Sequence, residues 1–119
     1  MSIKTSSAKA KGRKLQQWTV NKILARCPQL EPDDCKSNPM GAHGEDCLMS
    51  PAARRLLGIT VECKARKSLA VYSYYSQASA NAPKGMEPVV IIKADRKEPL
   101  AVVDAAYFIK LLTKEIKHD

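Results

Sequence analysis

The chain has 119 residues and a mass of 13.1 kDa, which is the size of one domain. Its 45% hydrophobic and 27% charged residues are typical of a globular protein. No segment approaches the ~18 consecutive apolar residues of a membrane span, and no apolar stretch follows the basic N-terminus as in a secretory signal. These features exclude a membrane protein, a coiled coil, a repeat array and a large multidomain enzyme. We expect a single domain over residues 1–119.

The net charge points to a polyanionic partner. Twenty Lys and Arg residues against twelve Asp and Glu give +8, with a sequence pI near 9.5. Small proteins with this balance most often bind nucleic acid, and the alternative is a basic protein that is merely soluble. Residues 1–26 contain no acidic residue and the following basic ones: Lys4, Lys9, Lys11, Arg13, Lys14, Lys22 and Arg26.

The four cysteines are not spaced as in a zinc site. No C-x-x-C pair joins Cys27, Cys35, Cys47 or Cys63, whereas zinc ribbons and fingers take two ligands from one tight turn. A set of Cys35, His43 and Cys47 remains as an alternative metal site. Because nothing in the sequence indicates secretion, we expect reduced thiols in a cytoplasm.

The first part of the chain predicts a helix followed by a long loop. Residues 1–11 are polar and basic without periodicity, which predicts a flexible arm. Residues 13–27 predict a helix, and residues 28–45, rich in Pro, Gly, Asp and Asn, predict a loop. Trp18 lies off the apolar stripe of this helix, at an edge or a subunit contact. The stripe itself has helical spacing and includes one polar residue: Gln16, Val20, Ile23, Leu24 and Cys27.

The remaining elements alternate between strands and helices. Ser50, Pro51 and Gly58 mark the cap, first residue and end of a short helix. Residues 88–94 are a continuous apolar run that predicts a central strand, and Ser68 and Asp104 are predicted helix caps. The other predicted elements are strands over 46–49, 59–65 and 100–103 and helices over 68–82 and 104–117. This order favours an α/β fold with a mixed β-sheet flanked by helices.

One strand carries charged residues where burial is expected. Side chains alternate along a strand, so Thr60, Glu62 and Lys64 share one face of residues 59–65. A hairpin-like pairing with the preceding strand would bring Asp46 beside Glu62. Charges in such a place are unfavourable unless they pair or bind a metal. The alternative is an ordinary surface ion pair.

Two carboxylates and an amine are the groups needed for metal-dependent phosphodiester hydrolysis. Mg²⁺ prefers one or two carboxylates with several waters, so Asp46 and Glu62 are candidate ligands, together with the backbone carbonyl of Cys63. The metal neutralises phosphate charge and activates water. Lys64 would orient the water or stabilise the charge of the transition state.

The same residues resemble a known nuclease signature. Asp46 followed by Glu62-Cys63-Lys64 resembles the PD-(D/E)XK motif, and its context is similar to Holliday-junction resolvases, in particular small phage-encoded ones. The matching segments are KGRKLQQW (11–18), GEDCLMSPAARRLLGITVECK (44–64), YSYYSQASANA (72–82) and PVVIIKADRKEPLAVV (88–103).

The resemblance implies a restriction-endonuclease-like core and a role for each site residue. Asp46 and Glu62 would be metal ligands and Lys64 the catalytic lysine. Gln16 stands where archaeal-type resolvases have a glutamate, four residues after a Lys-Gly pair. Three further residues would surround the site: Gln77, Glu45 in place of a proline, and His43 in place of a serine.

The sequence therefore predicts a Mg²⁺-dependent (or Mn²⁺-dependent), structure-selective DNA endonuclease. We expect a Holliday-junction resolvase that acts as a homodimer on branched or double-stranded DNA, in the host cytoplasm if it is phage-encoded. The alternatives are another repair or end-processing nuclease of this fold and a non-catalytic DNA-binding accessory protein. The predicted DNA contacts are Lys9, Lys11, Arg13, Lys14, Arg54, Arg55, Arg66 and Lys67.

Overall fold

The first helix begins earlier than the sequence pattern predicts. In the computed structural model, which describes residues 2–39 and 44–114, helix α1 spans Ser2–Arg26. The segment predicted as a flexible arm over residues 1–11 is therefore helical from Ser2 onward. Alanine and lysine are good helix formers, and no proline interrupts this segment, so the helix extends without an apolar stripe. Pro28 follows soon after its end.

The predicted loop contains regular structure. A short 3₁₀ helix, η1 (Pro32–Asp34), leads into strand β1 (Cys35–Ser37), which pairs antiparallel with β2 (Cys47–Met49). The prediction of an extended segment around β2 is confirmed, whereas the prediction of a long loop over residues 28–45 is wrong at η1 and β1. A three-residue strand between proline, aspartate and asparagine residues leaves little alternating pattern to detect.

Helix α2 (Pro51–Leu57) confirms its predicted start and end. The Ser50 hydroxyl accepts a hydrogen bond from the Ala53 backbone N–H at 3.1 Å, and Pro51 is the first helical residue. Gly58 ends the helix with φ +65°, a left-handed conformation that glycine adopts without strain. Because Gly58 directly precedes the next strand, this turn sets where that strand enters the sheet.

A three-stranded mixed sheet follows. Strands β3 (Ile59–Ala65), β4 (Glu87–Lys93) and β5 (Leu100–Val102) lie in the order β3-β4-β5. β3 and β4 are parallel, and β4 and β5 form an antiparallel hairpin. The central place of β4 and the hairpin are as predicted. β3 lies at one edge of this sheet, which matters for the site.

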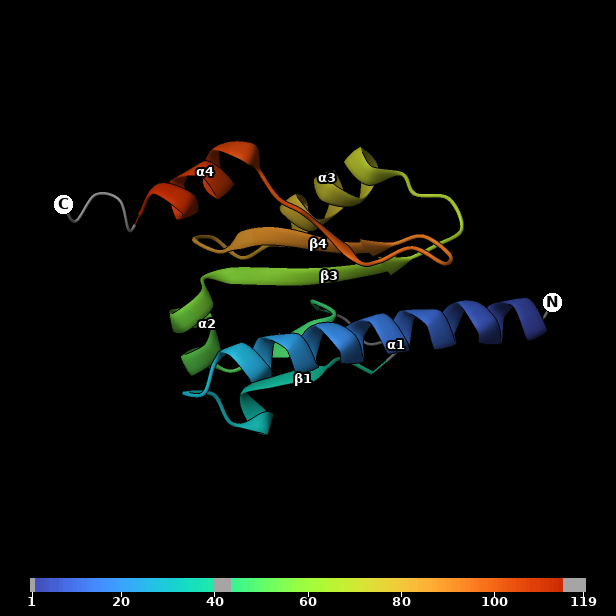
Figure 1. Cartoon of the computed structure of the whole chain (residues 1–119), viewed down its shortest axis with the longest axis horizontal. Coiled ribbons are helices and arrows are strands. Elements are labelled where there is room, and N and C mark those ends of the chain that lie inside the picture. The colour runs from blue at the N-terminus through green and yellow to red at the C-terminus, as the bar shows by residue number, and fades with distance from the viewer. Residues whose placement is uncertain (1, 40–43, 115–119) are drawn as a thin grey trace.

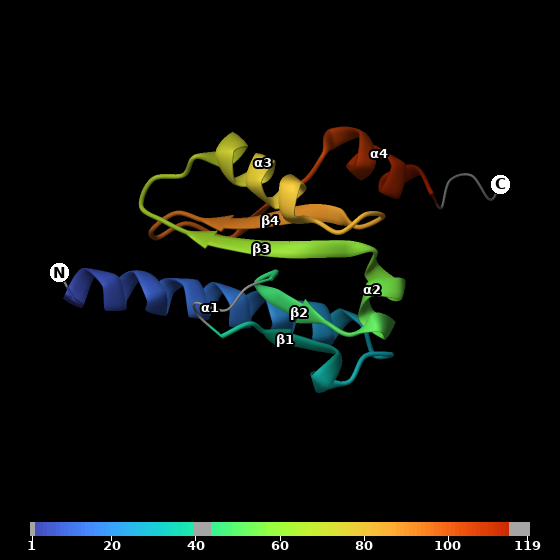
Figure 2. The ribbon, with the colours of Figure 1, turned by 180° about the vertical axis from the view of Figure 1, so that it is seen from behind.

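Helices cover both faces of the sheet (Figures 1 and 2). α1 packs on one face with Val61 and Cys63 of β3 in a shared core. α3 (Val71–Asn81) packs on the other face against Val90 and Ile92 of β4. The mixed α/β architecture predicted from the sequence is confirmed.

The start of α3 differs from its prediction, whereas the start of α4 agrees with it. α3 begins at Val71 with Ala70 as its cap, so the prediction of a Ser68 cap is wrong: the chain needs these residues to cross from the end of β3 to the other face. The Asp104 side chain accepts a hydrogen bond from the Tyr107 N–H at 2.9 Å and caps α4 (Ala105–Thr113), as predicted.

No helix within the described residues is long and apolar enough to cross a membrane.

Candidate active site

Asp46 joins the two sheets of the molecule. It lies directly before β2, and its backbone N–H donates to the Val61 carbonyl at 3.1 Å. Its carboxylate Oδ2 accepts a hydrogen bond from the Cys63 N–H at 2.7 Å. The expected pairing of 46–49 with the 59–65 strand is wrong as a strand ladder, because β2 pairs with β1. The backbone contact to the predicted strand comes from Asp46, which directly precedes β2.

Glu62 and Lys64 point away from α1, toward α3. Thr60 and Glu62 line one hollow of about 300 Å³ with Ala78 of α3. Lys64 places its Nζ 5.5 Å from the centre of the Tyr74 ring on α3. The prediction that Thr60, Glu62 and Lys64 share a face is therefore confirmed.

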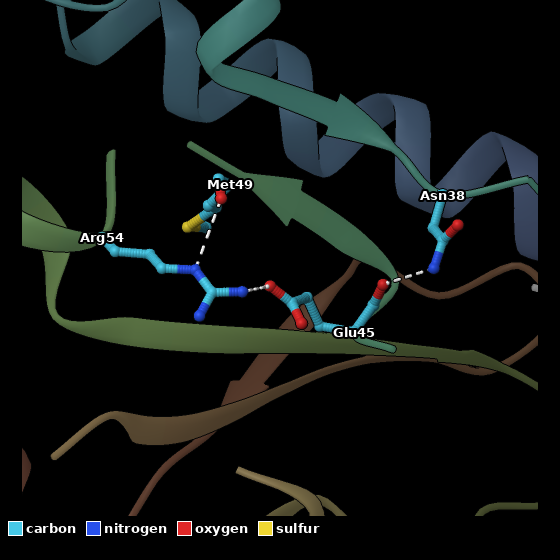
Figure 3. A network of polar contacts seen from close by, with 4 residues as sticks. All are labelled: Asn38, Glu45, Met49 and Arg54. Carbon is cyan, nitrogen blue, oxygen red and sulfur yellow. Dashed lines mark hydrogen bonds and ion pairs between the residues drawn. The ribbon is translucent and has the colours of Figure 1, made fainter. Parts of the chain in front are cut away.

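A polar network holds the segment that carries Asp46 (Figure 3). The Arg54 guanidinium donates to the Glu45 carboxylate at 2.7 Å and to the Met49 carbonyl at 3.3 Å. Asn38 donates from its side chain to the Glu45 carbonyl at 2.9 Å and from its backbone N–H to the Asp46 carbonyl at 2.8 Å. Glu45 and Asp46 are thus fixed on both sides.

This network changes the expected roles of two residues. The Glu45 side chain, only 12% exposed, forms an ion pair with Arg54, so its negative charge is balanced inside the protein. Arg54 was predicted to contact DNA, yet it holds Glu45 and the Met49 carbonyl. The structure therefore gives Arg54 a positioning role beside the site.

The two candidate carboxylates are held in an unfavourable electrostatic environment. Burial raises the pKa of Asp46, against the Cys63 N–H and the positive charge of Lys64, which lower it. Burial and then the negative charge of Asp46 raise the pKa of Glu62 to about 7, while Lys64 opposes the shift and Glu45 adds to it. A cation bound between Asp46 and Glu62 would relieve this repulsion.

The donor set fits a hard cation that keeps most of its waters. Within residues 2–39 and 44–114, no group of three or more His, Cys, Asp and Glu residues could hold a metal ion. Mg²⁺ needs only one or two carboxylates, and Asp46 with Glu62 meets that requirement. The Cys63 N–H points to the outer edge of β3, and the carbonyl of the same residue lies on that edge too, since both backbone groups of a strand residue face one side.

Gln16 is buried, as predicted, but on the other side of the strand. Its side chain lies in α1 with 4% exposure, and the Ser37 hydroxyl donates to its Oε1 at 2.5 Å. Ser37 pairs in β1 with Cys47, the neighbour of Asp46. Gln16 therefore supports the strand pair that carries Asp46.

Two further predicted residues do not join the site. Gln77 is exposed on α3, and its neighbour Ala78 lines the hollow beside Glu62. His43 lies outside the described residues, so its predicted position near the site stays a prediction.

The predicted DNA contacts divide between the two ends of β3. Arg66 and Lys67 are exposed just after its last residue, whereas Arg54 and Arg55 lie on α2 before its first. The predicted basic residues of α1 are all exposed: Lys9, Lys11, Arg13 and Lys14. Lys11 also forms an ion pair with Asp95 at 2.9 Å.

Sequence reasoning missed Asn38 and Tyr74. The Asn-Pro pair at 38–39 is a turn signal, but nothing in the sequence shows that the Asn38 side chain reaches Glu45. Tyr74 holds Lys64 through its ring, and its position in the first turn of α3 carries no motif. Both depend on tertiary contacts.

Comparison with models of known protein families, with curated proteins and with solved structures gave no match. A function must therefore be inferred from the site geometry and from the motif in the sequence.

We predict that Glu62→Gln stabilises the metal-free protein at high pH. The pKa of Glu62 is raised from 4.5 to about 7, so between these values the folded state binds a proton that the unfolded state has lost. Wild-type stability should then fall as pH rises from 4.5 to 7, and the Glu62→Gln variant should avoid this loss. For a half-buried group, allowing for solvent screening, we expect a gain of about 1–2 kcal/mol at pH 8.

Urea unfolding at pH 4 and pH 8 with a chelator measures this difference. Glu98→Gln, at an exposed glutamate of the β4–β5 connection, is the matched control and should change stability little at either pH. Equal stability of Glu62→Gln and wild type at pH 8 would show that the ionised Glu62 side chain does not destabilise the folded protein.

Proposed function

We propose that this protein is a metal-dependent DNA endonuclease with its active site at the outer edge of β3. The observation that carries the proposal is the placement of Asp46: its carboxylate is anchored on the Cys63 N–H, between the strand positions of Glu62 and Lys64. Two carboxylates with raised pKa values and a lysine thus converge on one short stretch of strand.

Asp46 and Glu62 would hold Mg²⁺, with the Cys63 carbonyl as a further oxygen ligand. Because Asp46 Oδ2 is engaged by the Cys63 N–H, Oδ1 would be the oxygen that faces the ion. When bound, the ion supplies charge neutralisation on the scissile phosphate and a water of lowered pKa. The protein fixes Asp46 before substrate arrives, which would limit reorganisation during the reaction.

Lys64 would supply the positive charge that meets the substrate. Its ammonium lies over the Tyr74 ring, an arrangement that steadies a cation without neutralising it. The charge of Lys64 also acts on both Asp46 and Glu62. Hydrolysis forms one P–O bond to water and breaks one P–O ester bond, and a fixed ammonium can stabilise the charge that develops on phosphorus-bound oxygen.

The distribution of charge supports DNA as the substrate. The chain has a net charge of +8, and basic residues are exposed on α1 and, at Arg66 and Lys67, just past the end of β3. Contacts of this kind bind phosphates without reading sequence, which suits an enzyme that selects DNA by shape. With the motif, this supports a resolvase with a restriction-endonuclease-like core as the particular activity.

A second copy of the chain would complete a resolvase. Paired nicks on a two-fold symmetric junction call for two active sites related by a two-fold axis. None of the described residues of α4 is buried. Its large apolar side chains are each about half exposed: Phe108, Ile109, Leu111 and Leu112. We propose that α4 of one protomer packs on α4 of its partner, since exposed apolar surface of this kind marks an interface.

Asp46→Asn and Glu62→Gln should abolish cleavage and preserve DNA binding. Each change removes one metal ligand and leaves the basic surface intact. Nicking of a four-way junction and of linear duplex DNA with and without Mg²⁺ measures activity, and a gel shift in chelator measures binding.

The outcome separates the candidate functions. Junction-selective nicking supports a resolvase, and nicking of linear ends or duplexes supports a repair or end-processing nuclease. DNA binding by wild type without any nicking in Mg²⁺ or Mn²⁺ would leave an accessory DNA-binding protein. Equal nicking by wild type and both variants would remove these carboxylates from the active site.

Lys64→Ala should slow single-turnover nicking far more than it weakens DNA binding. One aligned electrostatic donor is typically worth ~3–4 kcal/mol of barrier, so we expect a rate loss of more than about a hundredfold. Lys36→Ala, at an exposed lysine of β1, is the control and should leave the rate unchanged. A loss of less than about tenfold, ~1.4 kcal/mol, would make Lys64 a structural residue.

Leu112→Lys should convert the protein from dimer to monomer. The change places a charge in the apolar surface that the partner would cover, and sedimentation at micromolar concentration measures the mass. The monomer should nick one strand of a junction and lose paired cleavage. Tyr72→Lys, at an 88% exposed position of α3, is the matched control. A monomeric wild-type protein that makes paired nicks would contradict this interface.

A further inference from the structure

A second hollow lies on the opposite face of the sheet from Glu62. It measures about 530 Å³, within the ~300–1,000 Å³ range of ligand sites. α1 forms one wall, and the ends of β3 and β4 with the turn after β4 form the other. Figure 1 shows α1 running beside this end of the sheet. The residues that matter here are Lys11, Lys14, Trp18, Ala65, Lys93 and Arg96; we call this the α1 groove.

Trp18 gives the α1 groove an exposed aromatic wall. Trp18 is 40% exposed on α1 and lines the groove, so part of its indole is accessible there. Lys22 lies 5.5 Å from the centre of its ring. The neighbouring Leu15 is buried and closes the base of the groove. A flat ring between a closed apolar base and cations is a surface on which a nucleobase can stack.

Positive charge prevails along the groove. Its four basic side chains come from both walls, Lys11 and Lys14 on one side and Lys93 and Arg96 on the other, against two acids, Asp95 and Glu98. Lys11 forms an ion pair with Asp95 at 2.9 Å. The balance leaves cations on both walls of the groove, where they can contact the phosphates next to a base stacked on Trp18.

Arg96 is held at the rim by an unusual backbone conformation. Its φ is +63°, in the left-handed region, where glycine and asparagine are the usual residues. It lies in the turn between β4 and β5, closed by the Lys97 N–H donating to the Ala94 carbonyl at 3.1 Å. An arginine in this conformation is strained relative to a glycine, and residues with strained backbone conformations are concentrated at functional sites.

We propose that the α1 groove binds single-stranded DNA, with one base stacked on Trp18 and the adjacent phosphates at Lys14, Lys93 and Arg96. A duplex hides the faces of its bases, so stacking selects an unpaired strand. This inference rests on the proposed function: the single strand in the groove would be the unpaired strand of the branched DNA that the enzyme cleaves. The groove begins at Ala65, directly after Lys64, so the two sites share one strand.

Trp18 is the single tryptophan of the chain and reports on its own groove. Intrinsic fluorescence, titrated with a short oligothymidylate in chelator, should show saturable quenching that weakens with salt. A duplex of equal length should quench far less. Trp18→Leu should weaken single-strand binding about tenfold by fluorescence anisotropy of a labelled oligonucleotide, because a stacked base is lost. Trp18→Phe should restore most of that loss, because a ring is kept.

Arg96→Gly separates binding from folding. Glycine relieves the left-handed strain, so the variant should unfold at an equal or higher urea concentration and yet bind the oligonucleotide several-fold more weakly. Lys84→Ala, at an exposed lysine outside the groove, is the matched control and should bind as wild type does. Circular dichroism of each variant identifies any that fails to fold. If Trp18→Leu fails to fold, the binding of Trp18→Phe tests the role of the aromatic ring.

Three results would overturn the inference: no quenching by the single strand, equal quenching by the duplex, or unchanged binding in Trp18→Leu. The same titration on Asp46→Asn keeps the inference distinct from the proposed function. Quenching of the wild-type protein without its nicking any DNA in Mg²⁺ or Mn²⁺ would support the groove and reject the endonuclease. Nicking without quenching would support the endonuclease and reject the groove.

Discussion

The contact between the Asp46 carboxylate and the Cys63 N–H is the constraint on which the site depends. The molecule has two separate sheets, and β3 has an open edge where β2 approaches without forming a ladder. A side-chain acceptor at 2.7 Å and a backbone bond to Val61 at 3.1 Å close that gap. The residue that completes the fold at this point is also the residue that the proposed chemistry needs, so site and architecture are built by the same atoms.

The three acidic residues around this contact fall into two groups by their electrostatic environment. Glu45 forms an ion pair with Arg54 at 2.7 Å, whereas Asp46 and Glu62 have raised pKa values and Asp46 contributes to the shift at Glu62. Folding tolerates this repulsion because the rest of the domain supplies the stability. Glu45 is thus paired within the protein, whereas Asp46 and Glu62 have perturbed pKa values, a pattern that is common at functional sites.

The sequence predicted what local physics determines. The cap at Ser50, the stop at Gly58 and the alternation of Thr60, Glu62 and Lys64 all follow from rules that act within a few residues, and these predictions are confirmed. β1, the partner of β2 and the contact of Asn38 with Glu45 depend on distant parts of the chain, so local pattern missed or misplaced them. The long N-terminal part of α1 was missed because it lacks an apolar stripe. The burial of Gln16 was predicted, but its contact with Ser37 of β1 was not, because that contact depends on how α1 packs on the sheet.

Cys63 shows how closely the core and the site are coupled. Its thiol lies 3.7 Å from the Thr19 hydroxyl in the core under α1, while its backbone N–H holds Asp46. A hydrogen bond to Cys63 and burial raise the pKa of the neighbouring Cys47 thiol, so that side chain stays neutral. A change of side-chain volume at Thr19 or Cys63 would move the strand as a rigid piece and shift the aspartate with it. Mutations in this core would therefore affect the position of Asp46 as well as stability, and the proposed reaction would be sensitive to buried side chains that do not touch substrate.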